Sequence, residues 1–212
     1  MAKQIKLSDF NWKFVIQDKT AVEAGYVKDP RDSGGETNHG ITKALAEQYT
    51  TTLKAKFGWD GTMRNLTEEM AYYLYKTHFW DKMRLDDVLK RSAFLADRLF
   101  DFGINAGKAA PVTRLQRILN VMNNGGTYYK DIVADGAMGP GTLGALDAYI
   151  AKRGKEGIDI LIDQMFNMQG AYYVELAERR EKDEAFVYGW SGRVRRERRR
   201  YEAIELNGVS VE

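Results

Sequence analysis

The sequence contains no cysteine and only two histidines, His39 and His78. The absence of cysteine excludes disulfides, thiolate nucleophiles and cysteine metal ligands. With so few histidines, any metal site would have to be built mostly from carboxylates. We therefore expect neither a metal nor a cofactor.

Several catalytic and binding motifs are also missing. No serine lies in a G-x-S-x-G sequence, the zinc motif H-E-x-x-H is absent, and there is no G-x-x-x-x-G-K-[ST] phosphate loop. These absences disfavour a serine hydrolase, a zinc hydrolase and a nucleotide-binding protein. Carboxylates remain as the candidate catalytic groups.

Long apolar runs are absent as well. No stretch approaches the roughly eighteen apolar residues of a membrane span, and the N-terminal "MAKQIKLSDFNWKF" has no apolar core of the kind found in signal peptides. We expect the protein to be made as a soluble cytosolic product, which something else would have to release if it works elsewhere.

The residues that are present predict a globular protein. Of the 212 residues, 44% are hydrophobic and 12% are aromatic, and only three are proline. A chain of this composition can bury a substantial core and is unlike disordered sequences. Its length lies between one large domain and two small ones.

Apolar residues recur mostly at helical spacing. This spacing predicts helices over residues 8–22, 43–49, 67–80, 92–103, 111–125, 142–153 and 156–180 and from 184 onward. Ser8 or Asp9 is the expected N-cap of the first helix, and Gly103 and Gly125 are expected to end two others. Strand pairing is expected only within residues 26–42.

The glycines and small residues of "GINAGKAAP" at 103–111 suggest a boundary between two helical regions. The resulting division is a catalytic region at 1–102, a helical region at 103–183, and a basic amphipathic helix and tail at 184–212. The first two regions could pack as one body.

The formal net charge is only +2, but the basic residues are unevenly distributed and one segment is strongly basic. The stretch "RVRRERRR", Arg193–Arg200, contains six arginines and one glutamate. It could be a solvated helix face, a contact for anionic wall polymers, lipopolysaccharide or an anionic membrane, or a nucleic-acid site. Trp190, Val194 and Tyr201 are interleaved with the arginines, so an amphipathic helix on a membrane surface is one hypothesis.

The stretch "AVEAGYVKDPRDSGGETNHGIT", residues 21–42, holds the best candidates for carboxylate chemistry. Glycoside hydrolysis needs a proton donor and usually a second carboxylate. Glu23 closes an apolar helix, where burial would raise the pKa of its carboxyl group. The loop that follows offers Asp29 and Asp32, and Thr37 or Asn38 could orient a water molecule.

An alternative interpretation of the same stretch is a solvent-exposed turn. Asp-Pro and Gly-Gly sequences are common in turns, where Asp29 and Asp32 would bond to the local backbone. His39 could likewise contact substrate at the rim of a cleft, or it could form its hydrogen bonds with backbone groups in a turn. The aromatic run from Tyr72 to Trp80 is more typical of a core than of a sugar-stacking surface.

This stretch resembles the pattern of glycoside hydrolase family 108, in which E-G-G-Y is followed by D-P-x-D-x-G-G-x-T-x-x-G-I-T. The matching positions are Glu23, Gly25, Tyr26, Asp29, Pro30, Asp32, Gly34, Gly35, Thr37, Asn38, Gly40, Ile41 and Thr42. Further segments are similar to later parts of the pattern: "YLYKTHFWDKMRLDDV", "DFGINAGKAAPVTRLQRILN", "VADGAMGPGTLGAL" and "FVYGWSGRV". The middle two resemble the peptidoglycan-binding region usually joined to this family.

The resemblance implies a mainly α, lysozyme-like helical fold with a short β or loop segment beside the catalytic glutamate. It implies catalytic roles for Glu23, Asp32 and Thr37, and substrate binding by Tyr26, Asp29, Asn38 and His39. Asp29 is the substitute for Asp32 as second carboxylate. The sequence departs from the related patterns at two positions. Ala24 stands where glycine is usual, and Thr37 follows the acidic pair at a spacing one residue shorter than in phage lysozymes.

The implied function is that of a bacteriophage endolysin, a muramidase that hydrolyses the β-1,4 bond between N-acetylmuramic acid and N-acetylglucosamine during host lysis. The expected partner is bacterial peptidoglycan, with no nucleic acid, and the expected state is a monomer. A lytic transglycosylase and a non-catalytic cell-wall-binding module are the alternatives.

Overall fold

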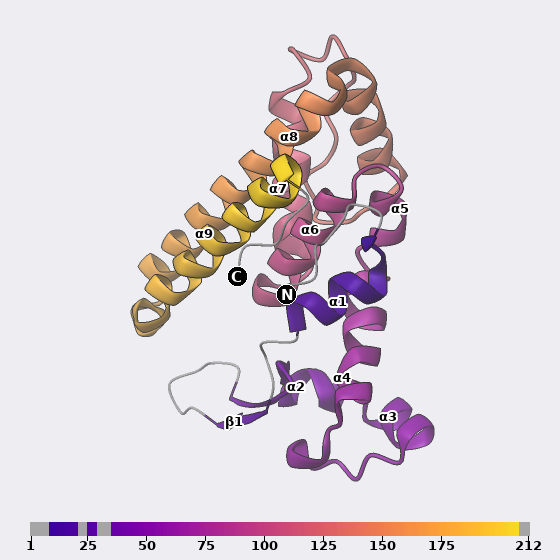
Figure 1. Cartoon of the computed structure of the whole chain (residues 1–212), viewed down its shortest axis with the longest axis vertical. Coiled ribbons are helices and arrows are strands. Elements are labelled where there is room, and N and C mark those ends of the chain that lie inside the picture. Colours follow the sequence, from indigo (N-terminus) through magenta and orange to yellow (C-terminus); the bar gives the residue numbers. More distant parts are fainter. Residues whose placement is uncertain (1–8, 21–24, 29–34, 208–212) are drawn as a thin grey trace.

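The computed structural model describes residues 9–20, 25–28 and 35–207, and most of these residues are helical (Figure 1). The first part of the chain contains a three-stranded antiparallel sheet among short helices, and the second part contains longer helices. The elements are α1 (Trp12–Thr20), β1 (Tyr26–Lys28), β2 (Glu36–Asn38), β3 (Ile41–Thr42), α2 (Lys43–Gln48), α3 (Thr50–Phe57), the 3-10 turn η2 (Met63–Asn65), α4 (Glu68–Leu74), the π-helix η3 (Tyr75–Trp80), α5 (Leu85–Leu89), α6 (Ala93–Ala106), α7 (Ala109–Val121), α8 (Pro140–Arg179), the 3-10 turn η4 (Glu181–Asp183) and α9 (Glu184–Asn207). The predicted mainly α fold with a short β segment is confirmed.

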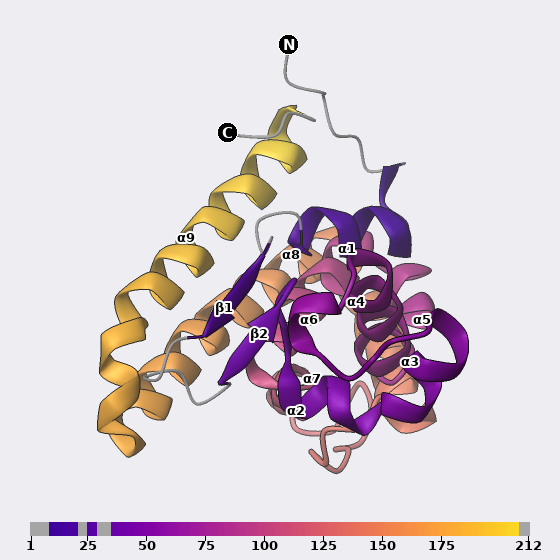
Figure 2. The same ribbon diagram turned by 90° about the horizontal axis from the view of Figure 1, so that it is seen from below.

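The sheet, α2 and α3 lie at one end of the molecule, and α8 and α9 run side by side along one flank (Figures 1 and 2). Between them stands α6, which packs against α5, α7 and α8. Five apolar side chains of α6 are fully buried: Leu95, Ala96, Leu99, Phe100 and Phe102. This helix is therefore the centre of the core.

One hydrophobic cluster runs through both parts of the chain. It extends from Val15 in α1 and Leu53 in α3, through Phe100, to Leu146 and Phe166 in α8. α6 continues past residue 102 to Ala106, and the backbone then turns at Gly107, where φ is 82°. The predicted division into 1–102, 103–183 and 184–212 stays a prediction, but the described parts of these regions share a core.

The first helix begins later than the sequence predicts. α1 starts at Trp12, and the Asn11 side chain caps it by accepting hydrogen bonds from the backbone N–H groups of Lys13 and Phe14 at 3.0 and 3.1 Å. The expectation of Asp9 as the cap is wrong, because Asn11 satisfies the free N–H groups of the first turn. Ser8, the other candidate, lies outside the described residues.

Gly103 does not end its helix, contrary to expectation. It lies inside α6, three residues before the helix ends. A Cβ atom at this position would lie only 2.7 Å from the Met83 methyl carbon. The glycine therefore serves close packing within the core rather than helix termination.

Other helix boundaries agree more closely with the sequence. Thr42 and Thr67 cap α2 and α4 through their side-chain oxygens, one residue before each helix begins. The two helices predicted over 142–153 and 156–180 correspond to the two arms of α8, which is broken at Gly154. No helix in the described part of the chain is both long and apolar enough to cross a bilayer.

Candidate active site

A cleft lies between α1, the turn that follows β2, and the start of the α4–η3 segment. Its volume is about 690 Å³. The residues that line it are Lys13, Gln17 and Thr20 of α1, His39 of the turn, and Glu68, Glu69, Ala71, Tyr72 and Tyr75 of α4 and η3. These residues line the cleft with charged and polar side chains and with aromatic rings on one wall.

The α1 wall follows from helical spacing. Lys13, Gln17 and Thr20 lie at i, i+4 and i+7, which places them on one side of the helix. Val15 and Ile16, on another side, are fully buried in the core. The apolar side thus fixes α1 so that its polar side and its C-terminal end face the cleft.

Three of the predicted site residues lie outside the described residues: Glu23, Asp29 and Asp32. In the sequence, Glu23 comes three residues after Thr20, which lines the cleft. Its predicted catalytic role, and those of the two aspartates, stay predictions.

The three strands place Tyr26, Thr37 and Asn38 beside one another. β1 and β2 pair with Tyr26 opposite Asn38, and β2 and β3 pair with Thr37 opposite Thr42. The strand pairing predicted within residues 26–42 is thus confirmed. Gly40 follows His39 in the tight turn and has a φ of 71°, a left-handed conformation that glycine adopts without strain.

Tyr26 is half-buried and takes part in two contacts within the protein. Its hydroxyl donates a hydrogen bond of 2.6 Å to Glu36 Oε1, and its ring lies 3.9 Å from the guanidinium carbon of Arg64. The bond from Tyr26 lowers the pKa of the Glu36 carboxyl group, and Lys43, 3.5 Å away, lowers it further. Glu36 is therefore a carboxylate beside the predicted site that the sequence analysis did not single out.

Asn38 points into the protein. Its side chain is 4% exposed, and its amide donates hydrogen bonds to the carbonyl oxygens of Met63 and Leu66 at 2.8 and 3.1 Å. These contacts give Asn38 a structural role, because they tie the sheet to the segment that leads into α4. Substrate binding by Asn38 stays a prediction.

Thr37 and His39 occupy the positions on either side of Asn38. Alternation along a strand directs neighbouring side chains to opposite faces, and Thr37 is accordingly half-exposed where Asn38 is buried. His39 adopts a left-handed conformation, with φ 48°, and its carbonyl oxygen accepts a hydrogen bond of 3.1 Å from the Tyr75 hydroxyl. His39 also lines the cleft, so both interpretations of this residue stay open.

The aromatic run divides between core and cleft. Tyr75, Phe79 and Trp80 are buried, as expected of a core stripe. Tyr72 is only half-buried and lines the cleft, and its ring lies 5.7 Å from the ring of Trp12. The interpretation of the run as core is therefore confirmed for Tyr75, Phe79 and Trp80 and does not hold for Tyr72.

The sequence analysis did not single out six of the residues that line the cleft: Lys13, Gln17, Thr20, Glu68, Glu69 and Ala71. The two glutamates lie in the first turn of α4, where negative charge is favourable. Within the described residues, no group of three His, Cys, Asp or Glu side chains is arranged to hold a metal ion. The cleft of this structure therefore offers carboxylates, an amine, an amide and a phenol for binding and proton transfer.

His78 lies outside the cleft, between two polar groups. Its Nδ1 atom is 3.0 Å from the Tyr49 hydroxyl, and its Nε2 atom is 2.6 Å from Lys108 Nζ. Burial lowers the pKa of His78, and the charges of Lys108 and Lys82 lower it further. The neutral ring can accept a hydrogen bond from the Lys108 ammonium group at Nε2, which indicates a role in packing η3 against the start of α7.

The basic segment Arg193–Arg200 is largely engaged within the molecule. Three of its arginines contact acidic residues of other helices: Arg193 contacts Asp101, Arg198 contacts Asp163, and Arg200 contacts Asp18. Arg195, Arg196 and Arg199 are exposed.

The apolar side of α9 is covered as well. Val194 and Tyr201 are buried, and the Trp190 ring lies 5.2 Å from that of Tyr173 in α8. Val194 and Tyr201 therefore belong to the core of the folded chain, and the hypothesis that α9 lies on a membrane surface stays a prediction. Contact of the three exposed arginines with anionic lipid stays a prediction, to be tested by vesicle binding after their replacement by glutamine.

Comparison with known proteins agrees with this structure. Residues 16–107 match the family described as Glycosyl hydrolase 108, and residues 110–195 match the family described as Predicted Peptidoglycan domain. No curated protein sequence matches the chain. The structure of Brucella abortus SagA is similar, with 26% sequence identity, a TM-score of 0.66, and coverage of 92% of this chain and 95% of SagA.

The two family matches follow one another along the chain, and they join a glycosidase region that holds the cleft to a helical region associated with peptidoglycan. Together with the structural likeness, they support a peptidoglycan-degrading enzyme. The chain belongs to glycoside hydrolase family 108 and carries a peptidoglycan-binding region after its hydrolase region.

Proposed function

We propose that the protein is a muramidase that hydrolyses the β-1,4 bond between N-acetylmuramic acid and N-acetylglucosamine, with Glu23 as the general acid. The observation that carries this proposal is the cleft at the end of α1. Thr20 lines this cleft, and the chain reaches Glu23 three residues later. Three residues of chain span at most roughly 10 Å.

The chemistry of the cleft wall suits a glycan. Tyr72 offers a ring beside Lys13, Gln17 and Glu69, and sugars are commonly bound by an aromatic face together with hydrogen-bonding groups around it. Glu23 would protonate the glycosidic oxygen as the bond to the anomeric carbon breaks. A carboxyl group can do this near neutral pH when partial burial raises its pKa.

A second carboxylate would stabilise the developing positive charge or activate the attacking water. We propose Asp32 for this role, with Asp29 as the substitute. Thr37, half-exposed in the middle of β2, would orient the water. Both aspartates belong to the segment that joins β1 to β2.

The test is the release of muropeptides from purified peptidoglycan by the wild type and by Glu23→Gln. Mass spectrometry then identifies the new chain ends. We expect reducing N-acetylmuramic ends from the wild type, and a decrease in rate of at least about 100-fold in Glu23→Gln, the scale of general acid catalysis. Glu47→Gln is the matched control, because Glu47 is exposed on α2 and does not line the cleft.

Each alternative predicts a different product. Anhydro-muramoyl ends would identify a lytic transglycosylase, which needs the acid but no attacking water. Wild-type protein that binds peptidoglycan without releasing fragments would indicate a wall-binding module. A folded Glu23→Gln variant with full activity would reject Glu23 as the acid.

We propose host lysis during a bacteriophage infection as the biological role, with the enzyme made in the cytoplasm. This proposal rests on the resemblance to endolysins and on a peptidoglycan substrate that lies beyond the inner membrane. Cells expressing the protein should therefore stay intact until the inner membrane is permeabilised. Lysis without permeabilisation would contradict the proposed route.

A further inference from the structure

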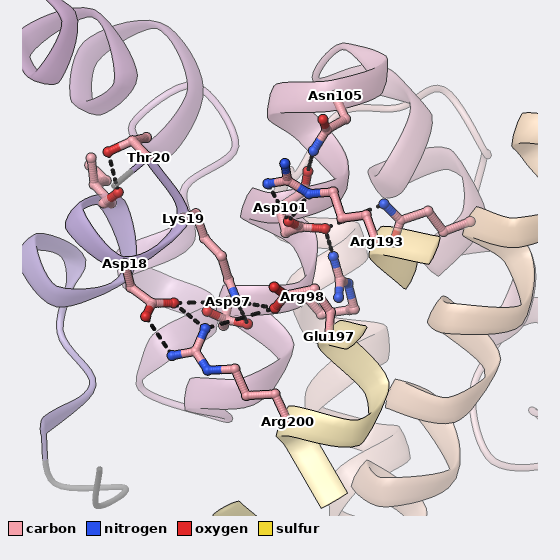
Figure 3. A network of polar contacts seen from close by, with 12 residues as sticks. Asp18, Lys19, Thr20, Asp97, Arg98, Asp101, Asn105, Arg193, Glu197 and Arg200 are labelled. Carbon is pink, nitrogen blue, oxygen red and sulfur yellow. Dashed lines mark hydrogen bonds and ion pairs between the residues drawn. The ribbon is translucent and has the colours of Figure 1, made fainter. Parts of the chain in front are cut away.

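Five charged side chains meet where α1, α6 and α9 approach one another (Figure 3). We call them the three-helix charge cluster. Its members are Asp18 and Lys19 of α1, Asp97 of α6, and Glu197 and Arg200 of α9. The two ends of the described chain are thus brought into contact by charged groups.

Lys19 is the central cation of the cluster. Its side chain is only 2% exposed, and its Nζ atom lies 3.1 Å from Asp97 Oδ2 and also donates a hydrogen bond to Glu197 Oε2. One ammonium group therefore connects the end of α1 to both α6 and α9.

Arg200 makes the second connection between α9 and α1. Its Nη2 atom donates to Asp18 Oδ1 at 2.6 Å, and its Nη1 atom donates to the other carboxylate oxygen. A two-pronged pair of this kind fixes the orientation of the two groups as well as their separation.

One turn away, α9 is also attached to α6. Both Nε and Nη2 of Arg193 donate to Asp101 Oδ1, at 3.0 and 2.9 Å, and the Asp101 side chain is fully buried. Positions 193, 197 and 200 lie on one side of a helix because they are separated by four and three residues. This polar side of α9 is therefore held on α6 while it reaches α1.

A contribution to the stability of the folded protein does not explain well why these charged side chains are buried. Burial raises the pKa of Asp97, and Asp97 Oδ1 has no hydrogen-bond partner among the described residues. Apolar side chains of similar volume often hold buried helices together as well as ion pairs do, or better. Ion pairs with a fixed geometry do, however, define the position of the helices relative to one another.

The position they define is that of the catalytic end of α1. Lys19 directly precedes Thr20, which lines the cleft, and Glu23 comes four residues after Lys19. α1 has nine residues, too few for a helix that is stable by itself. The placement of its end must therefore come from tertiary contacts such as this cluster.

We propose that Glu197 and Arg200 are positioning residues for the glycosidase reaction, acting through Lys19 and Asp18 on the segment that leads to Glu23. This inference rests on the proposed role of Glu23. Both residues lie beyond residue 195, where the second family match ends. The last helix then contributes to hydrolysis itself and is more than a part of the wall-binding region.

The first test compares Arg200→Gln, Arg200→Lys and a control, Arg179→Gln, which changes an exposed arginine at the end of α8. The measurements are kcat and apparent KM for the release of reducing ends from purified peptidoglycan. We expect Arg200→Gln to lower kcat about 10- to 100-fold, the scale of a small misplacement of catalytic groups, with KM within about twofold. Arg200→Lys keeps the charge and should recover part of the loss, and the control should match the wild type.

A second test asks whether Arg200 acts through Asp18. Asp18→Asn should lower kcat to a similar extent, and adding it to Arg200→Gln should cause little further loss, because the pair is already broken. Glu197→Gln should also lower kcat, whereas Glu202→Gln, at an exposed position of the same helix, should not.

Circular dichroism and thermal melting identify the variants that are folded. If Arg200→Gln does not fold, Glu197→Gln takes its place. A folded variant with wild-type kcat overturns the proposal, and so does a change in KM alone, which would indicate substrate binding. Wild-type protein that releases no reducing ends, or a fully active Glu23→Gln variant, would reject the proposed function instead.

Discussion

At the scale of single residues, Thr37 and Asn38 show how neighbours in one motif acquire different roles. Both residues lie in the stretch that resembles the family pattern, but alternation along β2 buries the Asn38 side chain and leaves Thr37 half-exposed. The Asn38 amide is bonded to backbone carbonyl oxygens of Met63 and Leu66. At least one residue of this stretch therefore has a structural role, because Asn38 attaches the sheet to the segment that leads into α4.

Replacing Asn38 by alanine should affect stability more than chemistry. Asn38→Ala leaves two buried carbonyl oxygens without this donor, a loss of about 1–3 kcal/mol in the free energy of unfolding. Urea denaturation measures this loss, and Thr37→Val is the matched comparison, expected to lower kcat with little change in stability. An Asn38→Ala variant as stable as the wild type would contradict the structural role.

At the scale of elements, the break in α8 depends on one glycine. Gly154 has φ 61° and ψ −151°, a conformation that other residues adopt only with strain. On either side of it the two arms of α8 follow the apolar periodicity that predicted two helices. After the bend, α8 packs against α6 and α7 and lies beside α9.

Gly154→Ala should therefore destabilise the protein by about 1–3 kcal/mol. Gly144→Ala is the matched control in the same element, because Gly144 is helical and exposed and an added Cβ would meet nothing within 4 Å. Alanine there should stabilise the helix by about 0.5–1 kcal/mol. Thermal melting should therefore show a lower melting temperature for Gly154→Ala and a higher one for Gly144→Ala. Equal changes in melting temperature would rule out strain at Gly154.

At the scale of the whole molecule, the three-helix charge cluster makes stability depend on pH. Burial opposes ionisation of Glu197, but the charges of Lys19, Arg98 and Arg200 together lower its pKa to about 2. A carboxyl group whose pKa falls from 4.5 on folding stabilises the folded state above pH 4.5, and this contribution is lost as the pH falls toward 2. Asp97, whose pKa is raised by burial, contributes with the opposite sign.

The contribution of Glu197 can be isolated by comparing the wild type with Glu197→Gln. The difference in their free energies of unfolding should be largest near pH 7 and should shrink as the pH falls below 4.5. Urea denaturation at a series of pH values measures it, and Glu202→Gln should show no such trend. A difference that is constant from pH 7 to pH 3 would mean that Glu197 is not stabilised as an anion by the cluster.

The sequence by itself determined the helical fold, most helix positions, the short strand pairing and the family. These features follow from local periodicity, capping residues and turn residues, which act between positions close in the chain. It also marked the segment around Glu23 as the candidate site.

Tertiary structure decided which polar residues share a surface. Lys13, Gln17 and Glu69 meet across the cleft, and Arg200 meets Asp18, because helices distant in sequence pack on α6. The same packing turned the apolar side of α9 toward the core. Local patterns specify that a helix has an apolar side, but only the packed molecule specifies what covers it.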